Sequence, residues 1–442
     1  RRPKTDFGSE QSERFRLRFP PSLQAMPSTH SLSRRGASLL DVSPMAPYIH
    51  EHMVRAADAD PNDPERYIGL CVAENLQMWD ILEPQLNRNR NVQRGSVAYD
   101  AMIGSQNLRE QIASFASEHV WGRSVDPDRV IVLAGGGSIL ETLFYVISSP
   151  GDGVLVPTPS YAGYWADLET RDNLKVVPVH TSSEDGFKLS PALLESAYID
   201  AGVPVSALLI TNPDNPTGRM MPSKDMNAAI QWARSHDLHV VVNEIYALSV
   251  HGDEPYEPVG RVIDNLATDV HEVWGFSKDF AMSGLRCGVM TSNNTDVLDA
   301  ISELAYWSLV SGDTQHLLAG MLRNTEWTET YLREMRSRLR RSYDVTTSAL
   351  DAADIPYVDG DAGLFLLADM RRFMDEATWD AEDRLWRKVL DEAAVNLTPG
   401  SACHIGEPGF MRICFATEPP EVVARAISRF AAILNNVCVK DT

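Results

Sequence analysis

The chain of 442 residues has few cysteines and no cluster of them. The five are scattered without C-x-x-C spacing, at Cys71, Cys287, Cys403, Cys414 and Cys438. Disulfide frameworks and structural zinc sites need closer and more regular spacing, so we predict neither, and no other metal site. Because free cysteines are typical of reducing compartments, we predict a cytoplasmic location.

The sequence also lacks a long apolar run and an excess of positive charge. No apolar run approaches the roughly 20 residues that are needed to cross a bilayer. Lys and Arg number 40 against 61 Asp and Glu, which gives a formal net charge of -21 at pH 7. Because this charge repels phosphate backbones and anionic lipids, we predict neither nucleic acid nor a membrane as a partner.

The pattern that is present is an alternation of short apolar strands with helical stretches from Tyr99 to about Ser311. A hydrophobic content of 44% over this length can bury a large core. The alternation predicts an α/β fold with a mostly parallel sheet covered on both faces. The expected strands are 130–133, 154–156, 176–177, 207–210, 240–242, 273–274 and 288–290. After about Thr314, long amphipathic helices and strands at 363–367 and 411–415 predict a smaller lobe.

One lysine stands out by its surroundings. Lys278 follows Gly275-Phe276-Ser277 and precedes Arg286 by eight residues. Amines become nucleophilic when burial and a nearby cation lower their pKa, which suits a Schiff base with pyridoxal phosphate. The competing interpretation is a Ser-Lys-Asp turn at the surface.

Three further segments favour the first interpretation because each follows an expected strand. They are a turn rich in Asn and Pro at 212–218, the polar residues of 243–246, and a glycine run at 135–137 that opens a helix. Ligands of parallel sheets bind at the carboxyl ends of strands, and free amides at a helix start bind anions.

These motifs, in this order, resemble the fold-type-I pyridoxal-phosphate enzymes of the class I/II aminotransferase superfamily, and among them the 1-aminocyclopropane-1-carboxylate (ACC) synthase-like branch. The resemblance covers roughly residues 38 to 432. The segments that carry it are 70–75, 212–218, 244–246, 277–279, 362–365, 368–371, 397–401 and 412–416. It implies the PLP-dependent transferase fold, with a mostly parallel seven-stranded sheet in a large domain and a smaller α+β domain.

The resemblance implies the domain boundaries as well. We expect a cofactor-binding large domain at 96–315, flanked by two parts of the small domain at 38–95 and 316–442. Residues 1–37 are expected to form a flexible basic arm, because the first 35 residues hold eight Arg or Lys against three acids. An organellar targeting peptide is the alternative, but such peptides are poor in acids.

Roles for the cofactor site follow from the resemblance. Lys278 is expected to bind the cofactor and then act as general base at the substrate's α-carbon, after an external aldimine has formed. Tyr246 and Asn215 are expected to donate hydrogen bonds to the ring's phenolate oxygen. Tyr161 is expected to stack on the ring, although ordinary core packing also explains a tyrosine there.

The phosphate and the substrate have their own expected contacts. The amides of Gly136 and Gly137, with Ser277 and Arg286, are expected to hold the phosphate. Arg412 matches the arginine that binds the substrate carboxylate, a task that suits its planar fork. The alternative for Arg412 is an ordinary arginine on a surface strand.

Three positions depart from the family pattern. Asn243 stands where the family has an aspartate that pairs with the pyridine nitrogen, so a neutral amide replaces a carboxylate there; this is either a specialisation or an introduced substitution. Gly275 replaces a serine that commonly binds the phosphate. Met102 lies where ACC synthases have a tyrosine from the neighbouring subunit, a part that Tyr99 is expected to take. We therefore predict a homodimer.

Glu74 is the clue to the substrate. It matches an acid that ACC synthases place near the sulfonium of S-adenosylmethionine, and a capping or ion-paired glutamate is the alternative. We expect elimination or substitution at a sulfur-bearing Cγ or Cβ of an amino acid, with carbon–carbon bond formation in specialised metabolism as one outcome. An aminotransferase that uses a 2-oxo acid and a non-catalytic relative that binds the cofactor remain open.

Overall fold

The computed structural model describes residues 32–40, 45–57, 59–60, 63, 65–263 and 267–438, without the side chains of Ser38 and 436–438. The chain divides into two units, 1–46 and 47–442. In the first unit, a short helix α2 spans Arg34–Ser38, and the Ser33 side chain caps it by accepting from the Gly36 amide. The rest of the predicted arm, residues 1–31, lies outside the described residues.

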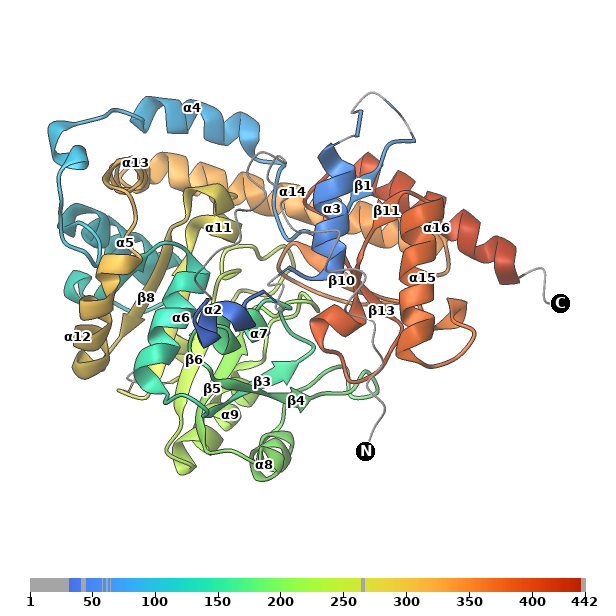
Figure 1. Ribbon diagram of the computed structural model, residues 1–442. Coiled ribbons are helices and arrows are strands. Elements are labelled where there is room, and N and C mark those ends of the chain that lie inside the picture. Colours follow the sequence, from blue (N-terminus) through green and yellow to red (C-terminus); the bar gives the residue numbers. More distant parts are fainter. Residues whose placement is uncertain are drawn as a thin grey trace. The chain divides into compact units, whose positions relative to one another are not determined.

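A seven-stranded sheet forms the centre of the second unit, as predicted (Figure 1). Its strand order is β2-β8-β7-β6-β5-β3-β4, and only β8 runs antiparallel to its neighbours. The strands are β2 Val130–Leu133, β3 Gly153–Thr158, β4 Lys175–His180, β5 Val205–Thr211, β6 His239–Asn243, β7 Val270–Gly275 and β8 Gly288–Ser292. All seven expected strands are therefore confirmed.

Helices cover both faces of this sheet because successive strand residues point to opposite sides. Leu209 and Val241 pack with α6, α7 and α12 on one face, whereas Leu208 and Val240 pack with α8, α9 and α10 on the other. These helices are α6 Gly136–Ile147, α7 Tyr164–Glu169, α8 Pro191–Asp200, α9 Ser223–Ser235, α10 Val259–Val262 and α12 Thr295–Leu304. Because both faces of the sheet are buried, a ligand-binding site is expected at the carboxyl ends of the strands.

A second layer of structure combines segments from both ends of the second unit. A four-stranded antiparallel sheet has the order β12-β13-β10-β9, and β1 pairs in parallel with β11. The strands are β1 Ile68–Gly69, β9 Tyr357–Val358, β10 Phe365–Asp369, β11 Val395–Asn396, β12 Thr398–Pro399 and β13 Phe410–Cys414. The pairing of Ile68 with Val395 joins the N-terminal part to the C-terminal lobe, although the exact domain boundaries stay a prediction.

The expected strand at 363–367 begins two residues later, at Phe365. Gly363 has a φ of +81°, and a Cβ there would approach the Phe365 ring to 3.2 Å. A residue in this left-handed conformation turns the chain rather than extending it, so the strand starts after it.

The remaining helices are α3 Pro47–Ala57, α4 Trp79–Asn89, α5 Gln106–His119, α11 Phe276–Asp279, α13 Gly312–Leu322, α14 Thr325–Ala352, α15 Trp379–Glu392 and α16 Pro420–Cys438. Within the described ranges, none of the helices is both long and apolar enough to span a membrane. The four cysteines whose side chains are described, Cys71, Cys287, Cys403 and Cys414, are buried and free. The side chain of Cys438 lies outside the described residues.

Candidate functional site

A cavity of about 240 Å³ lies where five strands of the large sheet end. β2, β3, β5, β6 and β7 all point their carboxyl ends to one edge, because the antiparallel β8 lies between β2 and β7. The segments that follow these strands supply most of the lining, which consists of Ala73, Gly136, Gly137, Leu140, Tyr161, Tyr164, Asp167, Thr211, Asn215, Asn243, Ile245, Tyr246, Ser277, Lys278, Ser283 and Arg286. Most residues predicted for the cofactor site are thus brought together.

Lys278 reaches the cavity from α11, the single turn of helix that follows β7. Its Nζ donates to the carbonyl oxygen of Ala73 over 2.6 Å. Burial of the amine lowers its pKa to about 8, an effect that the charge of Glu74 opposes and that of Arg412 reinforces. An amine with this pKa is partly neutral near pH 7, so it can act as a nucleophile or a base.

Asp279 holds the turn that carries Lys278. Its carboxylate accepts from the Ser249 hydroxyl over 2.7 Å, the Trp274 indole over 2.9 Å and the Leu248 amide over 3.1 Å. Burial raises the pKa of Asp279 to about 6 in spite of these donors. Because the carboxylate of Asp279 accepts hydrogen bonds from three donors, it anchors α11 and leaves the Lys278 side chain to face the cavity.

One end of the cavity is built to hold an anion. Gly135, with a φ of +96°, precedes α6, so the first amides of this 12-residue helix lack helical partners. The Arg286 guanidinium lies directly against Gly135, where a Cβ would collide with it. Ser277 lines the same cavity. A positive helix terminus beside an arginine attracts a phosphate group.

Asp167, which was not predicted as a site residue, also lines the cavity at this end. A Cβ on Gly137 would lie 3.8 Å from Asp167 Oδ1. Burial raises the pKa of Asp167 to about 6, and the nearby charge of Arg286 lowers it. Asp167 is in α7, six residues after Tyr161, and nothing in its local sequence marks it as a site residue.

Asn215, Tyr246 and Arg412 form a hydrogen-bonded row. Asn215 Nδ2 lies 3.5 Å from the Tyr246 hydroxyl, and Asn215 Oδ1 accepts from Arg412 Nη1 over 3.0 Å. Asn215 and Tyr246 line the cavity, while Arg412 lies behind Asn215. The two residues that we expected to act on one ring oxygen are therefore adjacent.

Arg412 is a buried cation without an anionic partner among the described residues. Only 3% of it is exposed, and its Nη2 donates to the neutral oxygens of Cys71, over 2.6 Å, and Thr398, over 3.0 Å. Its Nε has no hydrogen-bond partner. Buried charges are normally paired, so this guanidinium is suited to an anionic ligand and is not the surface arginine of the alternative interpretation.

Asn243 ends β6 and lines the cavity. Its Nδ2 donates to the Tyr164 hydroxyl over 2.8 Å, whereas its buried Oδ1 has no partner. Tyr164 also lines the cavity and was not predicted as a site residue. It stands three residues after Tyr161, and the two rings meet edge to face with centroids 5.3 Å apart.

Tyr161 and Glu74 lie at the border of the cavity. Tyr161 lines it and keeps 42% of its surface exposed, which is not ordinary core packing. Glu74 accepts from the Ser283 hydroxyl, and both Ser283 and the residue before Glu74, Ala73, line the cavity. Glu74 has no ion pair among the residues that the structure describes, so the alternative of an ion-paired glutamate finds no support there.

Two of the departures from the family pattern have a structural account. A Cβ on Gly275 would lie 2.9 Å from the Cys287 carbonyl oxygen and 3.2 Å from Ile245 Cδ1, so this backbone leaves no room for a serine. Met102 packs against the core of the large sheet. Tyr99 is 86% exposed and does not line the cavity of its own chain.

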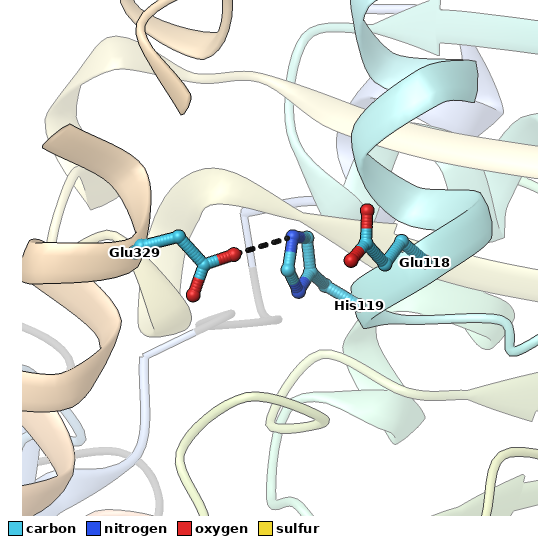
Figure 2. A group of neighbouring side chains, drawn as sticks. All are labelled: Glu118, His119 and Glu329. Atoms are coloured by element: carbon cyan, nitrogen blue, oxygen red, sulfur yellow. Dashed lines mark ion pairs between the residues drawn. The ribbon is translucent and has the colours of Figure 1, made fainter. Parts of the chain in front are cut away.

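A separate group of possible metal ligands consists of Glu118, His119 and Glu329 (Figure 2). His119 Nε2 and Glu329 Oε1 are 3.3 Å apart, and both glutamates are exposed. Figure 2 shows α5 and α14 approaching each other here, with the histidine between the two acids. We interpret the group as a surface ion pair between helices, because exposed carboxylates interact well with water and with a neighbouring imidazole.

Comparisons with known proteins agree with this geometry. The family model for aminotransferase class I and II matches residues 65–430. 1-Aminocyclopropane-1-carboxylate synthase 7 of Arabidopsis thaliana is 34% identical over 400 residues, which cover 85% of this chain and 89% of that protein. Synthase 3 of Oryza sativa subsp. japonica is 34% identical over 410 residues, covering 86% and 91%. The structure of aspartate aminotransferase from Thermus thermophilus with maleate has a TM-score of 0.77 at 25% identity, covering 91% and 100%.

Proposed function

The chain belongs to the class I and II aminotransferase family, and from this premise we propose that it binds pyridoxal phosphate in the cavity around Lys278 and acts on an amino acid. The relatives at 34% identity are named ACC synthases, so the ACC synthase-like branch is the part of the family that this chain resembles in sequence. The single observation that carries the proposal is the buried amine of Lys278, whose pKa is lowered to about 8.

The residues of the cavity fit this cofactor. Arg286 and the start of α6 suit its phosphate, and the unpartnered Oδ1 of Asn243 offers an acceptor to a ring nitrogen. Tyr246 and Asn215 offer a hydroxyl and an amide to the ring's phenolic oxygen. A cavity of about 240 Å³ gives room for one aromatic ring with its substituents.

When bound, pyridoxal phosphate delocalises into its ring the negative charge that is left when an amino acid loses its α-proton. Lys278 Nζ binds the cofactor and later moves the proton at the substrate's α-carbon. Tyr246 and Asn215 orient the ring, and Tyr161 covers it at the exposed border. Arg412 holds the α-carboxylate with its planar fork, which requires that it exchange the neutral oxygens of Asn215 and Cys71 for the substrate.

Glu74 supports a substrate with positive charge near its leaving group. Its carboxylate lies at the border of the cavity beside Ser283, close enough to Lys278 to raise the pKa of the amine. A carboxylate there attracts a sulfonium, as in S-adenosylmethionine. We therefore propose elimination or substitution at a sulfur-bearing Cγ or Cβ as the main activity.

Transamination is the second candidate, because the fold is also that of aspartate aminotransferase. Both activities need Lys278 and Arg412. They differ in whether the amino group leaves the substrate for a 2-oxo acid, and Glu74 has no evident part in that transfer. The presence of a carboxylate at this border favours the first activity.

We further propose a homodimer. Among the exposed apolar side chains are Tyr99, in the segment 99–104 that we expect to reach the neighbouring site, Val97 just before it, and Trp307, which is 73% exposed. Exposed apolar side chains are costly in water, and a second copy of the chain would bury them.

The experiment for the proposed function is borohydride reduction of the protein with bound pyridoxal phosphate, followed by peptide mass spectrometry. We expect the label on Lys278 and its loss in Lys278→Ala, while Lys175→Ala, on β4, keeps it. Cofactor that remains covalently attached to Lys278→Ala shows the assignment to be wrong. S-Adenosylmethionine and common amino acids are then compared for release of a thioether and for transfer of the amino group.

A further inference from the structure

One hydroxyl group, that of Tyr164, forms hydrogen bonds with residues at the ends of two neighbouring strands that line the cavity. Thr211 ends β5 and Asn243 ends β6, and the two residues are paired in the sheet. The Tyr164 hydroxyl lies 2.5 Å from Thr211 Oγ1 and 2.8 Å from Asn243 Nδ2. Tyr164 is only 1% exposed, so water does not compete strongly for these hydrogen bonds.

Counting protons fixes the direction of these bonds. Asn243 Nδ2 can only donate, so the Tyr164 oxygen accepts from it and turns its own proton toward Thr211. A phenol is the stronger acid of the two hydroxyls and an aliphatic hydroxyl the stronger acceptor, which favours the same direction. Asn243 lines the cavity, and its Oδ1 is buried and left without a partner.

We propose that Tyr164 is a positioning residue that fixes the amide of Asn243 so that Oδ1, and not Nδ2, is presented to the ring nitrogen of the cofactor. An oxygen can only accept, so the ring nitrogen must carry a proton to be satisfied. This inference rests on the proposed function. It assigns to a tyrosine and a neutral amide the task of keeping the ring nitrogen protonated in the absence of a carboxylate.

The opposite arrangement has the opposite consequence. If the amide is rotated by half a turn, Tyr164 donates to Oδ1 and Nδ2 faces the ring, where it is matched by a nitrogen without a proton. Removing the hydroxyl leaves the amide free to rotate. The protonation of the ring nitrogen therefore reports the orientation of Asn243 directly.

The test uses pyridoxal phosphate labelled with ¹⁵N in the ring, bound to the full-length protein, and follows the ¹⁵N chemical shift from pH 5 to 10. We expect Tyr164→Phe to lower the pKa of the ring nitrogen by about 1 to 2 pH units, the equivalent of one hydrogen bond from a charged donor. The ring of the phenylalanine keeps the packing of Tyr164 against the core. Since burial raises the pKa of Tyr164, its hydroxyl does not ionise in this range and the change is not one of charge.

The matched control is Tyr145→Phe, which removes a hydroxyl from an exposed tyrosine of α6 that does not line the cavity. Lys278, Asp167, Tyr246 and Arg286 also line the cavity and are unchanged in all variants, so they affect every curve equally. Asn243→Asp combined with Tyr164→Phe should restore the protonated nitrogen, because a carboxylate accepts in either orientation.

A wild-type protein that binds no labelled cofactor would overturn the proposed function. A wild-type protein that binds it, with Tyr164→Phe titrating like the wild type or toward higher pH, overturns only the role of Tyr164. If Tyr164→Phe does not fold, Thr211→Val decides the matter, since the freed hydroxyl can then donate to Asn243 Oδ1 and should lower the same pKa. An unchanged pKa in that variant contradicts the proposal.

Discussion

Lys278 donates from Nζ to the carbonyl oxygen of Ala73 over 2.6 Å, although the two residues are 205 positions apart in the sequence. Ala73 follows β1, whose partner strand β11 belongs to the C-terminal part of the chain. Lys278, on the helical turn α11 after β7, is thus held in place by the segment that also carries Glu74. Because Glu74 raises the pKa of the lysine, the charge on this segment affects the chemistry of the amine.

The first prediction concerns the pH at which Lys278 reacts. Its pKa is lowered to about 8, so the neutral amine, and with it the rate of covalent attachment of pyridoxal phosphate, should rise as the pH passes through about 8. Glu74→Gln removes a charge that raises this pKa, so the midpoint should move to lower pH and attachment at pH 7 should become several-fold faster. Stopped-flow absorbance measures the rate. Glu83→Gln, at an exposed position of α4, is the control, and a midpoint that moves upward in Glu74→Gln contradicts the prediction.

The second prediction concerns Gly275. Gly275→Ser should lower the free energy of unfolding by about 1–3 kcal/mol, because the new Cβ would lie 2.9 Å from the Cys287 carbonyl oxygen. Gly284→Ser is the matched control, since nothing lies within 4 Å of a Cβ there. Urea unfolding of both variants measures the difference. Equal stability would mean that the serine of the family pattern fits this backbone after all.

The third prediction concerns Arg412. Arg412→Lys keeps the charge and loses the planar fork, so the dissociation constant of an amino-acid substrate should rise about 10- to 100-fold, the equivalent of one charge-assisted hydrogen bond. Arg425→Lys, at an exposed position of α16, should leave it unchanged. Equilibrium titration with the substrate and with its decarboxylated amine separates the effect. If the two ligands weaken equally, Arg412 does not bind the carboxylate.

The sequence predicted the central sheet because its strands are short apolar runs such as 240–242, which stay strands when both faces are buried. The residues around Lys278 singled it out, and the family resemblance pointed to Asn215; both line the cavity, and their roles stay predictions. The sequence could not predict Tyr164 or Asp167, since both lie in α7 and reach the cavity only through the way that this helix packs. Their roles depend on distances that local sequence patterns do not contain.

The fourth prediction is the oligomeric state. Sedimentation equilibrium should give twice the chain mass of 49.0 kDa, with the exposed apolar side chains of the Val97 to Tyr99 segment and Trp307 at the subunit boundary. Trp307→Lys should weaken the dimer at least tenfold, because it places a charge in a desolvated contact. Trp379→Lys, on α15, serves as the control. A stable and active monomer of the wild type would reject the homodimer.

The last prediction concerns Asn243 itself. An amide oxygen accepts a charge-assisted hydrogen bond from a protonated ring nitrogen, which contributes about 1.5–3 kcal/mol, and a carboxylate adds the attraction of an opposite charge. Asn243→Asp should therefore accelerate removal of the substrate's α-proton by about 5- to 30-fold, as measured by deuterium exchange from solvent. The Tyr164 hydroxyl can donate to the new carboxylate, so both groups keep a hydrogen-bond partner. If exchange is unchanged or slower in Asn243→Asp, a weaker acceptor at this position is part of the native mechanism. The neutral amide then limits how much negative charge the ring takes up from the substrate's α-carbon.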